Sequence, residues 1–289
     1  MKVSVSHCLV MLLMCFNSVS LVCQEKESTD FVTIAILAKD KAHTLPLYLA
    51  CLEAQTWPAS KTYLYIRTNN NTDDTAQILK KWIARVSKKY AKIYFDDQDV
   101  AEQVEQFGQH EWNYTRFKVL GQIRQDSVDW AQENKSHYFV VDCDNFIYPD
   151  TLEAMMKTNV PIVAPLLQCN EKGFYSNYHE AIDANGYYIP SAFYYDIIDR
   201  KVRGIIEVPL VHCTYLIRYE MLNTVCYDDE SARYEYVIFS HSARKQHVPQ
   251  YIDNREIYGY ISFAESREEF DQEAYNYYFE GVIDEAQRI

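Results

Sequence analysis

The sequence predicts an α/β domain with a mainly parallel central sheet and a mixed extension in its C-terminal part. Three observations lead to this prediction. Continuous apolar, β-branched runs suit strands buried on both faces, segments of helical period lie between them, and the second half has strand-like segments without regular helices between them. No repeat or low-complexity linker interrupts the chain, so residues 31–289 are expected to form a single domain.

The first half alternates strands with helices. The run over 31–37 is apolar and β-branched, as in a central strand. Thr44 can cap the next helix, which has Pro46 in its first turn. In chain order we expect a strand over 31–37, a helix from Thr44, a strand over 63–66, a polar turn over 68–72, a helix from near Asp73, a strand over 91–95, an acidic loop over 96–111, an amphipathic helix through 117–131 and a strand over 137–141.

The second half follows a different pattern. Short segments rich in valine, isoleucine and tyrosine favour strands. They lie at 160–164, 186–189, 205–208, 210–217 and 248–252. Without regular helices between them, they indicate a mixed or antiparallel extension of the sheet.

Composition and charge exclude several classes of protein. The 289 residues carry a formal net charge of −13, which disfavours nucleic acid or an anionic membrane as a partner. Hydrophobic residues make up 48% of the chain and aromatic residues 15%, which is the opposite of a disordered composition.

The N-terminus reads as a targeting segment. Residues 1–23 are expected to be a secretory signal peptide, with an apolar run over 8–16 and a small-residue cleavage site, and 24–30 a polar linker. The run is too short to span a bilayer, and no later stretch reaches 18 apolar residues. The mature chain is therefore expected without a membrane span, in the ER or Golgi lumen, in a periplasm or outside the cell. An uncleaved anchor and a lipid anchor at Cys23 are the alternatives.

Removal of this leader leaves five cysteines whose spacing matches no zinc pattern. They are Cys51, Cys143, Cys169, Cys213 and Cys226. At most two disulfide bonds can form among them, and the sequence does not indicate the pairing.

The clearest chemical motif is a pair of carboxylates, Asp142 and Asp144, directly after the buried strand over 137–141. Ligands of open α/β sheets bind outside the carboxyl ends of the strands. Carboxylates there can hold Mg²⁺ or Mn²⁺ on a diphosphate. A solvated turn or a helix cap is the alternative interpretation of such a pair.

A second polar segment, 68–75, follows the strand over 63–66. Its amides and hydroxyls can hydrogen-bond a uracil and a ribose, although an ordinary N-terminal capping box has the same composition. A nucleotide-like and a metal-like strand end in one alternating α/β half together indicate a nucleotide-sugar transferase.

A set of short motifs runs through the chain. They are Leu37-Ala38-Lys39, Leu45-Pro46-x-Tyr48-Leu49, 68–75, Trp112-x-x-x-Arg116, 141–145, 161–167, 175–177, 186–188, 208–214, Ile238-Phe239 and Asn254-x-x-x-Tyr258-Gly259-Tyr260. Together they resemble the N-terminal glycosyltransferase domain of the procollagen galactosyltransferase and cerebral endothelial cell adhesion molecule family. The glycosyltransferase part of the lysyl hydroxylases is a more distant resemblance.

This resemblance implies a GT-A type, Rossmann-like fold, a UDP-sugar donor and Mn²⁺ or Mg²⁺. By position, Asp142 and Asp144 are the donor and metal carboxylates. Asn69 and Asn71 line the uridine pocket, and Asp73 orients the turn. Asn69 is a departure, because the family usually has an aspartate there. The resembling proteins also carry a second, C-terminal transferase domain.

The resemblance also implies which residue acts as the base. Transfer with inversion needs a carboxylate that deprotonates the acceptor hydroxyl. Glu235 is the candidate, at a position where the family has an Asp-Asp pair, and Asp228 and Asp229 are substitutes. A solvated acid on a helix is the alternative interpretation of Glu235.

The remaining candidates have two interpretations each. Lys39 and Arg116 are expected on the donor side, although Arg116 can equally pair with nearby acids. His212 is a donor or metal ligand, or a hydrogen-bonded core histidine within the apolar strand. For a third metal ligand, Asn254 with Tyr258 competes with His247, and Trp112 and several tyrosines can stack on a sugar.

These observations favour an enzyme that moves a hexose, galactose or glucose, from a UDP-sugar to a hydroxyl on a protein or glycan. The alternative is a secreted binding or adhesion module that keeps the GT-A fold without turnover. A purely structural α/β protein is the third hypothesis.

Overall fold

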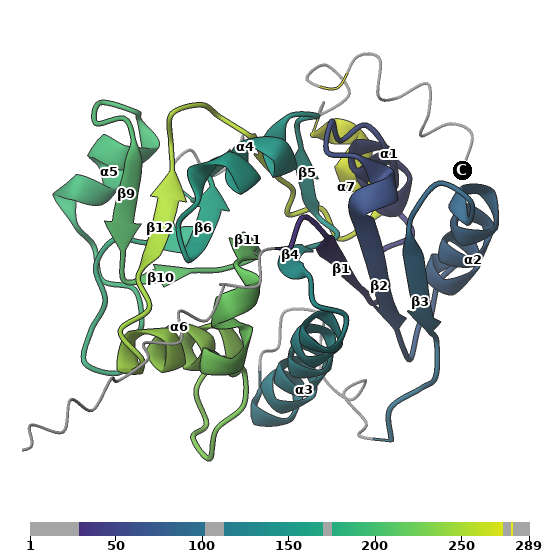
Figure 1. Cartoon of the computed structure of the whole chain (residues 1–289), viewed down its shortest axis with the longest axis horizontal. Coiled ribbons are helices and arrows are strands. Elements are labelled where there is room, and N and C mark those ends of the chain that lie inside the picture. Colours follow the sequence, from purple (N-terminus) through teal and green to yellow (C-terminus); the bar gives the residue numbers. More distant parts are fainter. Residues whose placement is uncertain (1–28, 102–112, 170–174, 274–278, 280–289) are drawn as a thin grey trace, which may run out of the picture.

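An eight-stranded sheet forms the centre of the molecule (Figure 1). The computed structural model describes residues 29–101, 113–169, 175–273 and 279. In spatial order the strands are β3 (Lys92–Asp96), β2 (Thr62–Thr68), β1 (Val32–Ala38), β4 (His137–Val141), β11 (Thr214–Ile217), β6 (Ile162–Pro165), β12 (Gln250–Asp253) and β9 (Ile205–Val208). Strands β11 and β9 are antiparallel to their neighbours, and the others share one direction. The predicted mainly parallel sheet with a mixed extension is confirmed.

Two small sheets and several helices complete the described structure. Strand β10 (Leu210–Val211) pairs with β8 (Tyr178–His179), and β13 (Gly259–Ile261) lies between β5 (Asn145–Ile147) and β7 (Leu167–Gln168). The helices are α1 (Leu45–Glu53), η1 (Ala59–Lys61), α2 (Thr75–Val86), α3 (Tyr114–Glu133), α4 (Thr151–Thr158), α5 (Ala192–Ile198), η2 (Tyr219–Thr224), α6 (Glu235–Lys245) and α7 (Arg267–Gln272).

Helices cover both faces of the sheet because alternate strand residues point to opposite sides. On β1, Ile34 and Ile36 belong to the core that includes residues of α1 and α2, and Ala35 belongs to the core that includes residues of α3 and α6. Figure 1 shows α3 and α6 on one side of the sheet and α1 and α4 on the other. Burial on both faces explains the continuous apolar run of this strand.

The predicted alternation of the first half is confirmed, and it brings three strand ends together. Strand β1 pairs in parallel with both β2 and β4, with Val32 opposite Thr62 and His137. The carboxyl ends of these strands therefore lie at one edge of the sheet. One detail differs, because the Thr44 hydroxyl donates to the Lys41 carbonyl (3.3 Å) and caps no amide of α1.

Three expectations for the second half are wrong, and the first two concern the chain before β9. Residues 186–189 form no sheet strand, because the Asp183 amide donates to the Tyr187 carbonyl (2.8 Å) and closes a turn that has Gly186 at a φ of 94°. Helix α5 then interrupts the segment that we expected to lack regular helices. The Ser191 hydroxyl caps it by accepting from the Phe193 amide (3.1 Å), and Tyr194 and Ile197 pack into the core.

The expected strand over 210–217 is broken into β10 and β11. Cys213 has a φ of 63°, in the left-handed region, so the chain cannot continue one ladder through it. Strand β10 pairs with β8, whereas β11 pairs with β4 and β6. His212 therefore lies at a break between two sheets and not within a strand.

Several expectations concern residues outside the described part of the chain. The signal peptide over 1–23, most of the linker and Trp112 lie there. Within the described ranges, no helix is long and apolar enough to cross a bilayer. The five described cysteines are all free thiols.

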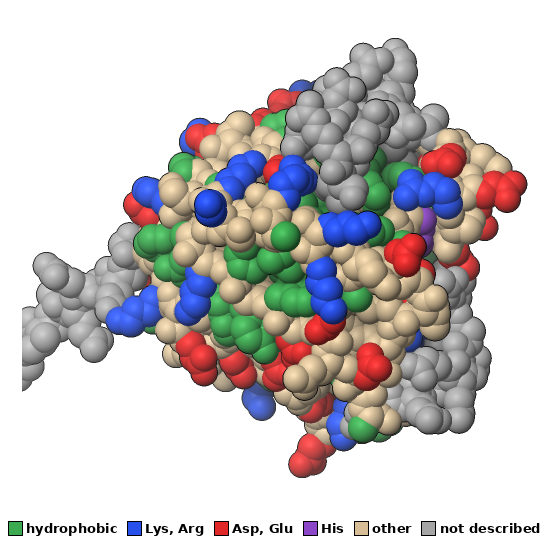
Figure 2. All heavy atoms as spheres, turned by 90° about the vertical axis from the view of Figure 1, so that its right-hand side faces the viewer, with side chains coloured by type: hydrophobic (Ala, Val, Ile, Leu, Met, Phe, Trp, Pro, Cys, Tyr) green, Lys and Arg blue, Asp and Glu red, His purple; other side chains and the backbone are tan. Residues whose placement is uncertain are grey.

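The edge strand β3 is flanked by an aromatic cluster. Tyr65 of β2 stacks on Tyr94 of β3, with ring centroids 5.0 Å apart, and Trp130 of α3 packs against both rings. Figure 2 looks onto the side that carries α2 and β3, and shows hydrophobic side chains gathered among lysine, arginine and acidic side chains.

Candidate active site

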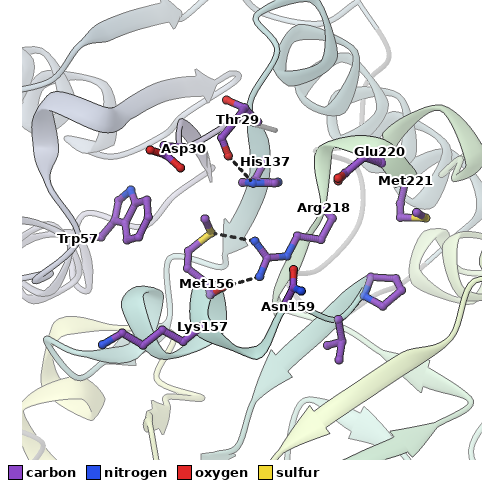
Figure 3. A pocket seen from close by; sticks show the side chains of 12 residues that line it. Thr29, Asp30, Trp57, His137, Met156, Lys157, Asn159, Arg218, Glu220 and Met221 are labelled. Atoms are coloured by element: carbon purple, nitrogen blue, oxygen red, sulfur yellow. Dashed lines mark hydrogen bonds between the residues drawn. The ribbon is translucent and has the colours of Figure 1, made fainter. Parts of the chain in front are cut away.

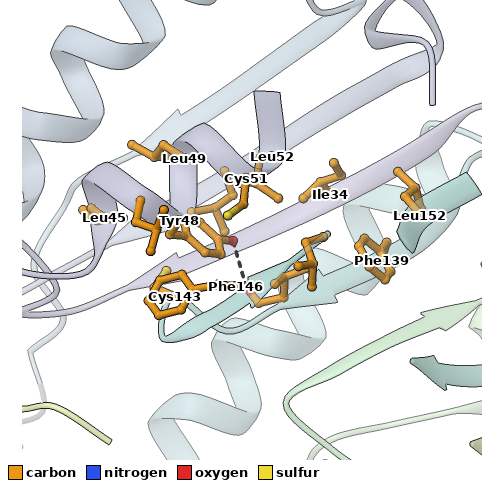
Figure 4. Close-up of a cluster of buried hydrophobic side chains, with 14 of the residues drawn as sticks. Ile34, Leu45, Tyr48, Leu49, Cys51, Leu52, Phe139, Cys143, Phe146 and Leu152 are labelled. Atoms are coloured by element: carbon orange, nitrogen blue, oxygen red, sulfur yellow. Dashed lines mark hydrogen bonds between the residues drawn. The ribbon is translucent and has the colours of Figure 1, made fainter. Parts of the chain in front are cut away.

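The Asp142-Cys143-Asp144 segment leaves β4 at the edge where the parallel strands end. Tyr48 of α1 donates from its hydroxyl to the Val141 carbonyl (2.8 Å), across the core shown in Figure 4. The Asp142 amide donates to the Cys213 carbonyl (3.1 Å), and the Ser262 amide to the Asp144 carbonyl (2.8 Å). Three separate parts of the chain therefore hold the backbone that carries the two carboxylates.

A cavity of about 670 Å³ opens in front of this segment. Seven of the nine predicted site residues line it, and they come from both halves of the chain. They are Lys39, Asn69, Arg116, Asp142, Asp144, His212 and Glu235. One cavity therefore contains both the residues predicted to bind the nucleotide, such as Asn69, and the predicted base Glu235.

Asn71 and Asp73 do not line this cavity but hold the turn that does. The Asn71 Oδ1 accepts from the Asp40 amide (3.0 Å), and the Asp73 Oδ2 accepts from the Ala42 amide (2.9 Å). Both side chains thereby tie the turn after β2 to the loop after β1. The neighbouring residues Asn70 and Thr72 line the cavity instead.

Arg124 of α3 is a site residue that sequence reasoning missed. Its Nη2 contacts the two Asp142 carboxylate oxygens at 2.8 and 3.2 Å, and its Nε lies 3.6 Å from Glu235 Oε1. Its side chain is only 7% exposed. The available signal was its spacing, because Arg124 lies seven residues after the buried Phe117 and four before the buried Val128, on one stripe of the helix.

Lys41 is a second missed residue, in the loop after β1. Its Nζ lies 2.8 Å from Asp144 Oδ2, and it also lines the cavity. Each aspartate of the motif is therefore paired with a cation of the protein, Asp142 with Arg124 and Asp144 with Lys41.

Glu235, the first residue of α6, is nearly enclosed. Burial raises the pKa of its carboxyl above the ordinary value, and the Arg124 guanidinium opposes this shift. Its Oε2 is buried and has no hydrogen-bond partner within the described part of the structure. The substitute acids Asp228 and Asp229 do not line the cavity, and Asp229 pairs with Arg233 at 2.7 Å.

An aromatic wall stands beside Glu235. The His212 ring packs against His179 and Tyr236, each with centroids 5.3 Å away, and against Tyr175 at 5.9 Å. Burial lowers the pKa of His179 to about 4 and that of His212 well below its usual value, so both rings are neutral at pH 7. His212 is therefore buried and also lines the cavity, and its role as a donor or metal ligand stays a prediction.

The candidates for a third metal ligand lie elsewhere. Asn254 accepts from the Gly204 amide (2.8 Å) and donates to backbone carbonyls, and the Tyr258 hydroxyl donates to Asp253 Oδ2 (3.1 Å). None of Asn254, Tyr258 and His247 lines the cavity. In the described ranges, no group of three histidine, cysteine or acidic residues is placed to hold a metal ion.

The two aspartates nevertheless fit a hard divalent cation. Mg²⁺ and similar ions bind through one or two carboxylates and complete their shell with substrate phosphates and water. The Asp144 side chain is 29% exposed toward a cavity large enough for a nucleotide sugar. Asp142 and Asp144 are therefore the residues that would hold such an ion.

A smaller cavity, of about 300 Å³, lies at the opposite edge of the sheet (Figure 3). It is lined by His137 at the start of β4, by Met156 of α4 and by Arg218 after β11. Two nitrogens of the Arg218 guanidinium contact the sulfur and the carbonyl oxygen of Met156, so its charge is held within the wall.

The fold is that of GT-A glycosyltransferases. The S. aureus protein TarS 1-349 in complex with UDP-GlcNAc superposes with a TM-score of 0.54 at 14% identity, covering 82% of this chain and 59% of that one. A mannosyltransferase from Pyrobaculum calidifontis, in complex with GDP-Man and Mn²⁺, has a TM-score of 0.50 at 13% identity and covers 81% and 57%.

The chain belongs to glycosyltransferase family 25, since the N-terminal domain of that family matches residues 29–279. Procollagen galactosyltransferase 2 of Homo sapiens is 33% identical over 240 residues, which are 80% of this chain and 38% of the relative. The inactive glycosyltransferase 25 family member 3 of Homo sapiens is 28% identical and covers 85% and 43%. The expected resemblance is confirmed, and the chain spans about two-fifths of the length of these relatives.

Proposed function

We propose that this protein transfers a hexose, galactose or glucose, from a UDP-sugar to a hydroxyl group on a protein or glycan, and that it needs a divalent metal ion. One observation carries the proposal. The polar turn at Asn69, the carboxylates Asp142 and Asp144, and the buried carboxylate Glu235 line a single cavity at the carboxyl edge of the sheet.

The donor would lie along the first half of the chain. Asn69 and its neighbours after β2 offer amide groups for the uracil and ribose. Lys39 and Arg116 line the same cavity and bring positive charge to a diphosphate. A solved structure of the same fold holds UDP-GlcNAc, which supports a nucleotide-sugar donor.

Mn²⁺ or Mg²⁺ would be held by Asp142 and Asp144. A bound ion of this kind neutralises charge on the departing diphosphate. The protein contributes Arg124, which contacts both oxygens of the Asp142 carboxylate and opposes the rise in its pKa that burial causes.

Glu235 would accept the proton of the attacking hydroxyl. Its raised pKa brings it closer to neutral pH, which suits a general base. The buried Oε2 lacks a partner among the described residues, and an acceptor hydroxyl would supply the missing donor. The wall of Tyr175, His212 and Tyr236 offers stacking surfaces for a sugar beside it.

The relatives and the sequence also support a proposal about the location. A donor of this class and a procollagen-type acceptor would meet in the secretory pathway, and the expected signal peptide over 1–23 would direct the chain there. We therefore propose a lumenal or secreted enzyme.

A panel of UDP-sugars, tested for release of UDP with and without Mn²⁺, examines this proposal. We expect one donor to be hydrolysed only with metal, and Asp144→Asn to abolish the reaction. Glu235→Gln should slow it by about 100-fold or more with UDP affinity unchanged. Glu207→Gln, on an exposed position of β9, is the matched control. Absence of UDP binding in calorimetry at millimolar UDP would refute the proposal.

A binding module that has lost turnover is the second candidate. Family members labelled inactive match this chain at similar length, and Glu235 is a single acid where the resembling family has two. This alternative predicts that UDP binds while hydrolysis stays at background for every donor. Hydrolysis that depends on Glu235 would exclude it.

A further inference from the structure

The two aspartates of the metal site differ in how firmly their cations are held. Arg124 reaches Asp142 from within α3 and its side chain is 7% exposed. Lys41 reaches Asp144 from the cavity wall and its side chain is 28% exposed. The Arg124–Asp142 pair is nearly buried, whereas the Lys41–Asp144 pair is partly exposed and can separate within the cavity.

The backbone of Lys41 is held rigidly, so its side chain starts from a defined position. The Lys41 amide donates to Thr75 Oγ1 (2.7 Å), and its carbonyl accepts from the amides of Thr44 (3.1 Å) and Leu45 (3.0 Å). The preceding Asp40 has a φ of 51°, and its amide is held by Asn71. This framework aims the Lys41 side chain at Asp144, 103 residues further along the chain.

The ammonium group of Lys41 occupies Oδ2 of Asp144, one of the two carboxylate oxygens that could bind a metal ion. Its Nζ lies 2.8 Å from Asp144 Oδ2, which is a contact distance for a charged hydrogen bond. A divalent cation bound to the same carboxylate would stand within a few ångström of the ammonium, and two like charges at that distance repel each other strongly.

We infer that the Lys41 ammonium and a divalent metal ion are mutually exclusive partners of Asp144. Lys41 then weakens metal binding in the absence of donor. Its ammonium group moves away from Asp144 when the metal ion binds. This inference rests on the proposed function, because it takes Asp144 as a metal ligand.

Titration of the full chain with Mn²⁺ in the absence of donor tests the inference, with free Mn²⁺ followed by electron paramagnetic resonance. Lys41→Met removes the charge and keeps the length of the side chain. We expect it to bind Mn²⁺ about two- to fivefold more tightly than the wild type, because one partly exposed ion pair no longer competes with the metal. Lys41→Arg keeps the charge and should bind as weakly as the wild type.

Lys39→Met is the matched control for this titration. Lys39 lines the same cavity, but its Nζ lies 3.8 Å from Asp40 and makes no ion pair with Asp144. Its loss should change the Mn²⁺ affinity less than Lys41→Met does. Equal gains in the two variants would mean that only the net charge of the cavity matters, and would overturn the inference.

A measurement on the wild type avoids any effect of substitution on folding. Labelling with a lysine-directed acylating reagent, read by peptide mass spectrometry, compares Lys41 with Lys39. Addition of Mg²⁺ should raise the ratio of Lys41 to Lys39 labelling, because the ammonium leaves Asp144. An unchanged ratio at saturating Mg²⁺ would contradict the exchange.

The two possible failures are distinguishable. Equal Mn²⁺ affinity in wild type and Lys41→Met, lost in Asp144→Asn, would overturn the competition and leave the proposed function intact. Absence of Mn²⁺ binding in all these proteins would overturn both the competition and the metal dependence.

Discussion

At the scale of single residues, the site depends on one buried cation that serves two carboxylates. Arg124 contacts Asp142 at 2.8 Å and Glu235 at 3.6 Å. A buried carboxylate without a partner is costly, so this arginine keeps both acids in the core at a tolerable free energy. It thereby positions the predicted base and a predicted metal ligand at once.

Replacement of Arg124 by methionine should destabilise the fold. The change leaves Asp142 and Glu235 without their shared cation, and loss of one partner of a buried pair costs about 3–5 kcal/mol. Urea unfolding measures this loss. Arg124→Lys, which keeps the charge, should lose less, and a cost below about 1 kcal/mol for Arg124→Met would show that the network does not hold the fold together.

His137 should make the protein sensitive to acid. Its Nδ1 accepts from the Tyr219 amide (2.9 Å) and its Nε2 donates to the Thr29 carbonyl (2.9 Å), as drawn in part in Figure 3. Burial, assisted by the nearby Arg218, lowers its pKa to about 4. The unfolded chain takes up this proton near pH 6.5, so stability falls as the pH drops from about 6.5 to 4.

The slope of this loss reaches about 1.4 kcal/mol per pH unit for one histidine. Unfolding free energies measured across the window should show it, and His137→Gln should have a smaller slope than the wild type. Part of the remaining slope would belong to His43, His179, His212 and His241, whose pKa values are lowered by burial as well. An identical slope in the variant would contradict the role of His137.

At the scale of secondary structure, the approach of α3 to the chain before α6 needs a glycine. A Cβ at Gly121 would lie 2.7 Å from the Tyr227 carbonyl oxygen and 3.5 Å from the Cβ of Glu235. Backbone atoms cannot yield as a flexible side chain can. Gly121 has a poor helical propensity, but its lack of a side chain allows α3 to pack closely against the chain near Glu235.

Gly121→Ala should be destabilising even though alanine is the better helix former. Alanine gains about 1 kcal/mol in a helix, whereas overpacking against backbone costs about 1–3 kcal/mol. The net loss, read from thermal unfolding, should be accompanied by weaker donor binding because Arg124 and Glu235 shift. Lys118→Ala, on the exposed face of α3, is the control and should leave both unchanged. A stabilised Gly121→Ala would refute the close approach.

The sequence predicted the elements that repeat a simple pattern and missed those that depend on local chemistry. Periodicity and apolar runs indicate β1, β2 and β4, because each lies inside a regular sheet that is covered on both faces, and they indicate the short β3 at its edge. The break at Cys213 leaves no such signal, since residues 210–217 are apolar on both sides of it. Helix α5 is short, and its capping residue Ser191 stands in an otherwise aromatic segment.

At the scale of the whole molecule, the position of the site was predictable and its charge pairing was not. Asn69, Asp142 and Asp144 follow the ends of predicted parallel strands, and such strands end at the same edge of a sheet. The sequence therefore predicted that these residues lie near one another. The pairs Lys41–Asp144 and Arg124–Asp142 span 103 and 18 residues and depend on the phase of α3 and on the loop after β1. No pattern in the sequence shows which of these distant side chains come into contact.

Ligand binding should stabilise the whole fold. UDP with Mn²⁺ at about 100 times the dissociation constant adds about 2.7 kcal/mol, which raises the Tm by about 5–10 °C in a domain of this size. Differential scanning fluorimetry measures the shift. Asp144→Ala or a chelator should remove it, and a shift that persists with chelator would argue for donor binding without metal.

Strand β11 is the fifth of eight strands and is hydrogen-bonded on both sides, to β4 and to β6. Backbone amides in such a position exchange with deuterium only when most of the sheet opens. The segment before it carries His212 and Cys213, so this wall of the cavity is anchored to the centre of the sheet. A destabilised variant would therefore lose this side of the site together with its native core, and partial unfolding at the outer strands would leave the site in place.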